Sequence, residues 1–178
     1  MPQQTNTSSH PGLQRLNELS DGNARQTLLA VCGSGQWADR MIASRPFASA
    51  EALFAAADKN WFGLEKQDWL EAFSHHPRIG ERNLAQPKFA ATAVQSSKEQ
   101  SGMAGASEAV RAEFASGNVD YEKKFGHVFL ICATGKTGEE MLGSLRQRMK
   151  NDAATELRNA ANEQSKIVRI RLGKLVES

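Results

Sequence analysis

Helical spacing of apolar residues dominates the C-terminal part of the chain. Thr137 and Glu140 have the spacing of a capping box, in which two side chains satisfy backbone N–H groups at the start of a helix. Asn151 and Asp152 supply a second N-cap, which opens a long helix. The apolar residues behind these two signals recur at helical spacing: Met141, Leu142, Leu145 and Met149, then Leu157, Ala161, Val168, Leu172 and Leu175. Two amphipathic helices are therefore predicted to close the chain.

The preceding part of the chain contains shorter apolar segments separated by glycine and proline. Helices are predicted after Ser20-Asp21, around Trp37, after Ser49 and from Lys66, with ends at Gly33-Ser34-Gly35, Arg45-Pro46 and Pro77. The chain holds 25 alanines but 12 aromatic residues, which favours helices over a strand-rich sandwich. Residues 1–11 are polar and are predicted to form a disordered leader, and residues 12–178 a single compact multi-helix domain.

A short apolar run interrupts this helical pattern. It extends from Val128 to Ala133 and is flanked by Gly126 and Gly135. In so short a run, hydrophobic periodicity does not separate a strand from a buried turn of helix. Both alternatives stay open on these residues alone.

Charge and cysteine content exclude several classes of protein. The net charge of +2 is small, and the C-terminal basic residues alternate with acidic ones, which argues against a nucleic-acid partner. Cys32 and Cys132 belong to no Cys-x-x-Cys pair and are predicted to be free thiols, and no histidines have metal-ligand spacing, so no metal site is expected. The apolar runs are too short to span a membrane, and the polar leader lacks the apolar stretch of a secretory signal, so a cytoplasmic location is expected.

The first candidate for chemistry is His76. Because Pro77 disfavours helical geometry at the preceding residue, a helix should end here and leave the imidazole at its carbonyl end. The helix dipole at that end favours the protonated imidazole. A histidine held in this way suits general acid–base catalysis near neutral pH. The alternative is a histidine that only caps the helix.

The second candidate is the segment with Ser96, Glu99 and Gln100. Ser-x-x-Glu is itself a capping box, so helix initiation alone could explain it. A hydroxyl, a carboxylate and a carboxamide within one turn would also suit a ligand rich in N–H and C=O groups.

Four motifs in order resemble a known enzyme family. They are His76-Pro77-Arg78-Ile79-Gly80, Ser96-x-x-Glu99-Gln100, Tyr121-x-x-Lys124-Phe125-Gly126 and Phe129-Leu130-Ile131-Cys132-Ala133. Together they resemble the 2-oxo-4-hydroxy-4-carboxy-5-ureidoimidazoline (OHCU) decarboxylases, and the resemblance covers roughly residues 13–175. It implies an all-α, cofactor-free, typically homodimeric carboxy-lyase that converts OHCU to (S)-allantoin, the last step from urate to allantoin.

The resemblance also implies roles for individual residues. His76 would be the catalytic histidine and Glu99 its acidic partner. The substrate pocket would be lined by Pro77, Ser96, Gln100 and the backbone of Phe129–Ala133, including Phe129, Ile131 and Ala133. The apolar run would then be an extended or helical wall.

Three questions stay open at this level. Either Arg148 or Arg171 could anchor the substrate, and core-edge salt bridges could explain both. A helical module without enzymatic activity could instead present Lys166, Arg169 and Lys174 to an acidic partner. The same His/Glu pair could also serve a hydrolase or isomerase that acts on a related ureide.

Overall fold

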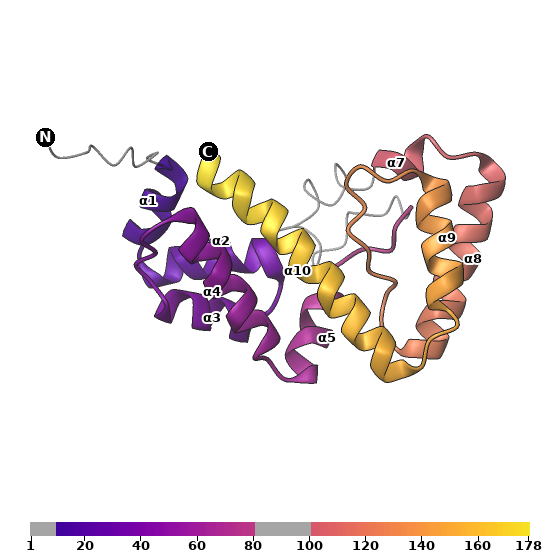
Figure 1. The fold of residues 1–178 in the computed structure, drawn as a ribbon, viewed down its shortest axis with the longest axis horizontal. Helices are drawn as coiled ribbons and strands as arrows, with labels where there is room; N and C mark the ends of the chain where they lie inside the picture. The colour runs from indigo at the N-terminus through magenta and orange to yellow at the C-terminus, as the bar shows by residue number, and fades with distance from the viewer. Residues whose placement is uncertain (1–9, 81–100) are drawn as a thin grey trace, which may run out of the picture.

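The computed structural model describes residues 10–80 and 101–178, and all regular secondary structure in these ranges is helical (Figure 1). The helices are α1 (Pro11–Glu18), α2 (Asp21–Cys32), α3 (Gly35–Ala43), α4 (Ala50–Phe62), α5 (Lys66–Ser74), α7 (Ser101–Ala104), α8 (Glu108–Phe125), α9 (Gly138–Arg148) and α10 (Ala153–Glu177). The all-α prediction is therefore confirmed. None of the described helices is long and apolar enough to cross a membrane.

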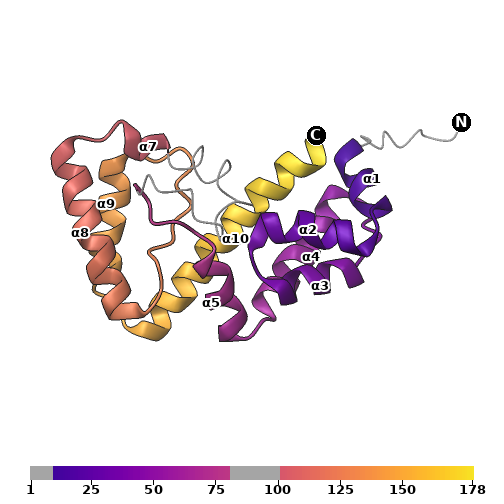
Figure 2. The same ribbon diagram turned by 180° about the vertical axis from the view of Figure 1, so that it is seen from behind.

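Helix α10 connects two groups of helices. Helices α1 to α4 pack at one end of the molecule, α8 and α9 pair at the other, and α10 runs between them (Figures 1 and 2). Each group has its own core of buried residues. The N-terminal core includes Leu28, Trp37, Leu53, Trp61, Phe73, Val168 and Leu172; the C-terminal core includes Phe114, Tyr121, Phe129, Met141 and Leu145.

The capping signals of the sequence act where they were predicted. The Glu140 amide donates to Thr137 Oγ1 at 3.2 Å, and the Thr137 amide donates to Glu140 Oε2 at 2.8 Å, which completes the capping box of α9. Asp152 accepts from the Thr155 amide at 2.8 Å and so caps α10. These bonds satisfy N–H groups that have no partner within the helix.

Two further predictions concern the N-terminal leader and the two cysteines. Helix α1 begins at Pro11, so the last residue of the predicted leader is the first residue of a helix; residues 1–9 lie outside the described residues. Neither Cys32 nor Cys132 forms a disulfide in the described part of the chain, and Cys32 is buried while Cys132 is half-buried.

The apolar run 128–133 is extended and alternates between the two cores. Its even-numbered members, Val128, Leu130 and Cys132, pack with the N-terminal core. Its odd-numbered members, Phe129, Ile131 and Ala133, pack with the C-terminal core. A period of two is the geometry of a strand. The run is therefore a single strand-like segment between two helical layers, and we refer to residues 128–133 as the pocket wall.

Candidate active site

The end of α5 places His76 inside the molecule. Helix α5 ends at Ser74, His75 is its C-cap, and the His76 amide donates to the Phe73 carbonyl at 3.1 Å. Pro77 then directs the chain away from the helix axis. The His76 side chain is only 8% exposed. His75, not His76, therefore occupies the helix cap, and the capping explanation for His76 does not hold.

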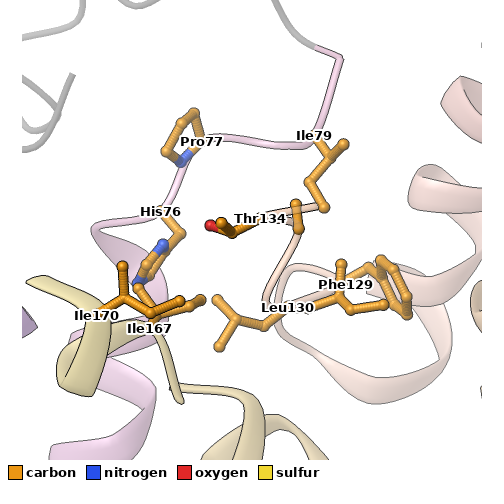
Figure 3. Close-up of a pocket in the computed structure, with 10 residues that line it drawn as sticks. His76, Pro77, Ile79, Phe129, Leu130, Thr134, Ile167 and Ile170 are labelled. Atoms are coloured by element: carbon orange, nitrogen blue, oxygen red, sulfur yellow. The ribbon is translucent and has the colours of Figure 1, made fainter. Parts of the chain in front are cut away.

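A pocket opens beside this imidazole, and three separate segments contribute to it (Figure 3). The segment after α5, the pocket wall with Thr134, and α10 supply its lining: His76, Pro77, Ile79, Phe129, Leu130, Ile131, Ala133, Thr134, Ile167 and Ile170. Eight of the ten lining residues have apolar side chains, and His76 and Thr134 are the exceptions. The Thr134 hydroxyl lies on the side of the pocket that faces His76 (Figure 3).

Five residues predicted from the sequence lie together in this pocket. They are His76, Pro77, Phe129, Ile131 and Ala133. Ser96, Glu99 and Gln100 lie outside the described residues, so their predicted roles remain predictions. The sequence did not identify Ile79, Thr134, Ile167 and Ile170 as pocket residues. Ile167 and Ile170 belong to the amphipathic pattern of α10 and carry no signal that distinguishes a pocket residue from a core residue.

The prediction that the helix dipole favours a protonated His76 is wrong. Burial lowers the pKa of His76 to about 3, and the positive charge of Arg171 acts in the same direction, while the carboxamide of Gln164 opposes both. The partial charge at a helix end contributes little against the cost of burying a full imidazolium charge. His76 is consequently a neutral imidazole at neutral pH and can accept a proton.

The two candidate arginines have different surroundings. Arg171 is 1% exposed, donates to the Val31 carbonyl at 3.0 Å, and places its charge where it affects His76. Arg148 forms an ion pair with Glu156 and donates to the Leu130 carbonyl at 2.7 Å. Arg171 is therefore the arginine associated with His76, and Arg148 belongs to the support of the pocket wall.

Fold and site together define a class: an all-α protein with a buried histidine beside a small pocket that is lined mainly by apolar side chains. The chain belongs to the OHCU decarboxylase family, whose model matches residues 17–173.

Named relatives agree with this assignment. The chain is 44% identical over 149 residues to the uric acid degradation bifunctional protein TTL of Arabidopsis thaliana, covering 81% of this chain and 44% of that protein. It is 26% identical over 167 residues to a 2-oxo-4-hydroxy-4-carboxy-5-ureidoimidazoline decarboxylase of Haloferax volcanii, covering 93% of this chain and 96% of that protein. The chain thus spans less than half the length of the bifunctional relative.

Solved structures show the same fold. A crystal structure of OHCU decarboxylase in the presence of (S)-allantoin superposes with a TM-score of 0.74 at 37% identity, covering 86% of this chain and 99% of that one. A crystal structure of (S)-allantoin synthase, at 18% identity and a TM-score of 0.67, covers 92% of this chain and 53% of that one and supports the fold alone.

Proposed function

We propose that this chain catalyses the cofactor-independent decarboxylation of OHCU to (S)-allantoin, the last step in the degradation of urate to allantoin. The observation that carries the proposal is the buried imidazole of His76 beside a pocket lined mainly by apolar side chains, in a chain of the OHCU decarboxylase family. The Haloferax volcanii relative is named for this decarboxylase activity.

The reaction itself needs little from the protein. In OHCU, the carboxylate leaves from a carbon that bears a hydroxyl and adjoins a ring C=N bond. When the C–C bond to CO₂ breaks, its electron pair forms a new C=C bond, and the C=N pair moves to nitrogen, which takes a proton. The resulting enol then becomes a ketone as the neighbouring carbon is protonated. Because the substrate ring accepts the electrons, the chemistry requires no separate electron sink.

The pocket residues can supply what remains: orientation, exclusion of water and control of a proton. Neutral His76 accepts the hydroxyl proton and returns a proton to the enol, and protonation on one face fixes the S configuration. Pro77 holds the backbone at His76, while Phe129, Ile131 and Ala133 exclude water. In this proposal Glu99 is the acidic partner, and Ser96 and Gln100 bind the substrate.

Arg171 is the arginine that we propose for the anionic substrate. Its guanidinium is buried and its positive charge lowers the pKa of His76, so it lies close enough to the imidazole to attract the carboxylate of a substrate bound there. Arg148 pairs with Glu156 and supports the Leu130 carbonyl. We further propose a homodimer and a cytoplasmic location, both of which rest on the resemblance and the composition.

The contacts of the basic residues on α10 do not favour the alternative of a non-enzymatic module. Arg169 pairs with Asp58 at 2.9 Å, and Lys166 pairs with Glu163 at 2.5 Å. Two of the three basic residues proposed to bind an acidic partner are thus engaged within the chain itself.

The direct test uses OHCU generated in situ, which decays spontaneously to racemic allantoin. Circular dichroism then isolates the enzymatic contribution, because only a chiral catalyst yields an excess of the S enantiomer. We expect accelerated loss of CO₂ and an (S)-allantoin signal. Racemic product at the spontaneous rate would refute the proposal. Activity on a related ureide, without decarboxylation, would favour the hydrolase or isomerase alternative.

A further inference from the structure

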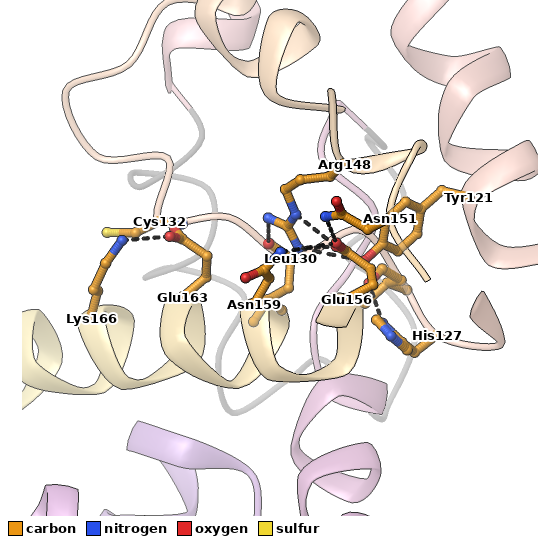
Figure 4. A network of polar contacts seen from close by, with 11 residues as sticks. Tyr121, His127, Leu130, Cys132, Arg148, Asn151, Glu156, Asn159, Glu163 and Lys166 are labelled. Carbon is orange, nitrogen blue, oxygen red and sulfur yellow. Dashed lines mark hydrogen bonds and ion pairs between the residues drawn. The ribbon is translucent and has the colours of Figure 1, made fainter. Parts of the chain in front are cut away.

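The pocket wall is a strand without a partner strand in the described part of the chain. Buried backbone N–H and C=O groups need hydrogen-bond partners, which a sheet would normally supply. Here, side chains from α9 and α10 supply two of them (Figure 4). Arg148 Nη1 donates to the Leu130 carbonyl at 2.7 Å, and the Cys132 amide donates to Glu163 Oε2 at 2.7 Å.

These two contacts lie on one edge of the wall. In an extended chain, the N–H and C=O of one residue point to the same edge, and successive residues alternate between edges. The backbones of Leu130 and Cys132 therefore face the edge that carries Arg148 of α9 and Glu163 of α10, and Ile131 faces the opposite edge. Among the described residues, none forms a hydrogen bond with the N–H or C=O of Ile131.

Both anchoring side chains are themselves held in place. Glu156 is fully buried and binds Arg148 at 2.6 Å, and it also accepts from Asn151 at 2.9 Å and from the Tyr121 hydroxyl. Glu163 is 16% exposed, and its second oxygen binds Lys166 at 2.5 Å. The wall is thus anchored by one buried ionic cluster and one carboxylate near the surface.

We propose that Glu163 is a positioning residue, which fixes the edge-on orientation of the wall through the Cys132 amide so that the N–H and C=O of Ile131 are directed at the ligand. The inference deepens the proposed function, on which its catalytic consequence rests. Glu163 is not among the residues that line the pocket in the described structure. It acts through the backbone of the pocket wall. In other sites, too, residues that do not bind the ligand themselves hold the binding residues in the right orientation.

The position of Glu163 makes the proposal testable without unfolding the protein. Removing Arg148 would leave Glu156 as an unpaired buried charge, which is expected to disrupt the fold. Glu163 has no such constraint, because water can reach its carboxylate. Glu163→Ala removes the acceptor for the Cys132 amide, Glu163→Gln keeps an oxygen acceptor, and Lys166→Ala removes only the ion pair.

The experiment compares these three variants with the unmodified chain by amide hydrogen exchange at Cys132 and by the kinetics of OHCU decarboxylation. Loss of a charge-assisted hydrogen bond corresponds to roughly a tenfold effect. We expect Glu163→Ala to speed exchange at Cys132 about tenfold, to raise KM more than it lowers kcat, and to bind (S)-allantoin more weakly. Glu163→Gln should restore most of each property, and Lys166→Ala should change little.

Two results would overturn the proposal. Unchanged exchange at Cys132 in Glu163→Ala would show that the carboxylate does not hold the wall. Faster exchange at Cys132 with unchanged KM and kcat would show that catalysis does not depend on this anchoring of the pocket wall. A chain that fails to decarboxylate OHCU at all would refute the proposed function instead, and the exchange measurement would still decide whether Glu163 anchors Cys132.

Discussion

Arg171 and His76 come from distant parts of the sequence and are buried in the same region, where the arginine's positive charge disfavours protonation of the imidazole. This part of the protein therefore combines a cationic group with a neutral base. In the proposed function, the arginine attracts the substrate carboxylate, and the substrate hydroxyl supplies the proton that His76 accepts.

His76→Asn tests the base directly. We expect kcat to fall by about 10²- to 10⁴-fold, the range that general acid–base catalysis usually contributes. The measurement is the rate of (S)-allantoin formation by circular dichroism. His75→Asn is the matched control, since His75 is the C-cap residue of α5 through its backbone and does not line the pocket, and the variant should retain activity. Near-normal production of the S enantiomer by His76→Asn would remove this residue from the mechanism.

The low pKa of His76 also predicts how stability depends on pH. Between about pH 3 and pH 6.5 the folded protein keeps His76 neutral, while the unfolded chain binds a proton there. The free energy of unfolding should therefore rise with pH across this window, and His76 should cause no further change above it. The slope that His76 contributes is at most about 1.4 kcal/mol per pH unit.

Urea denaturation at several pH values measures that slope. His127, whose pKa burial also lowers, contributes to the same dependence, so the comparison must be with His76→Asn. In His76→Asn, the part of the pH dependence that comes from His76 should disappear, and the part that comes from His127 and other groups should remain. Identical slopes in the two proteins would show that His76 titrates normally in the folded state.

The sequence and the structure agree where the determinants are local. Thr137, Glu140 and Asp152 cap the helices they were predicted to cap, because a cap depends on neighbours within one turn. The alternation of the pocket wall was not predictable. Both faces of the wall are buried, so Val128–Ala133 is apolar throughout and shows no period of two. The protonation state of His76 depends on burial by α10, and Arg171 was distinguished from Arg148 only by its position in space.

Glu156 is expected to be essential for stability. It is fully buried and binds Arg148, Asn151 and the Tyr121 hydroxyl. Glu156→Leu would leave the Arg148 guanidinium, 12% exposed, without its counter-ion, which typically costs about 3–5 kcal/mol. Chemical denaturation should show this loss, and Glu113→Leu, which removes an exposed partner of Arg146, should cost less than about 1 kcal/mol. Equal losses of stability in the two variants would show that the buried ion pair contributes no more to the free energy of unfolding than the exposed one.

Gly12 marks the closest approach between α1 and α10. A Cβ at this position would lie 1.9 Å from the Leu175 carbonyl oxygen and 2.9 Å from the Val176 Cα, and backbone atoms cannot rotate out of its way. Gly12→Ala should therefore separate the two helices and destabilise the protein by about 1–3 kcal/mol. Gly173→Ala is the matched control on α10, because nothing lies within 4 Å of its Cβ, and there alanine should stabilise the helix by up to about 1 kcal/mol. Thermal denaturation of both variants checks the signs of the two stability changes.

The activity of Gly12→Ala should be unchanged at temperatures where the variant remains folded, because α1 lies away from the His76 pocket. A loss of activity under these conditions would mean that the packing of α1 against α10 affects the pocket.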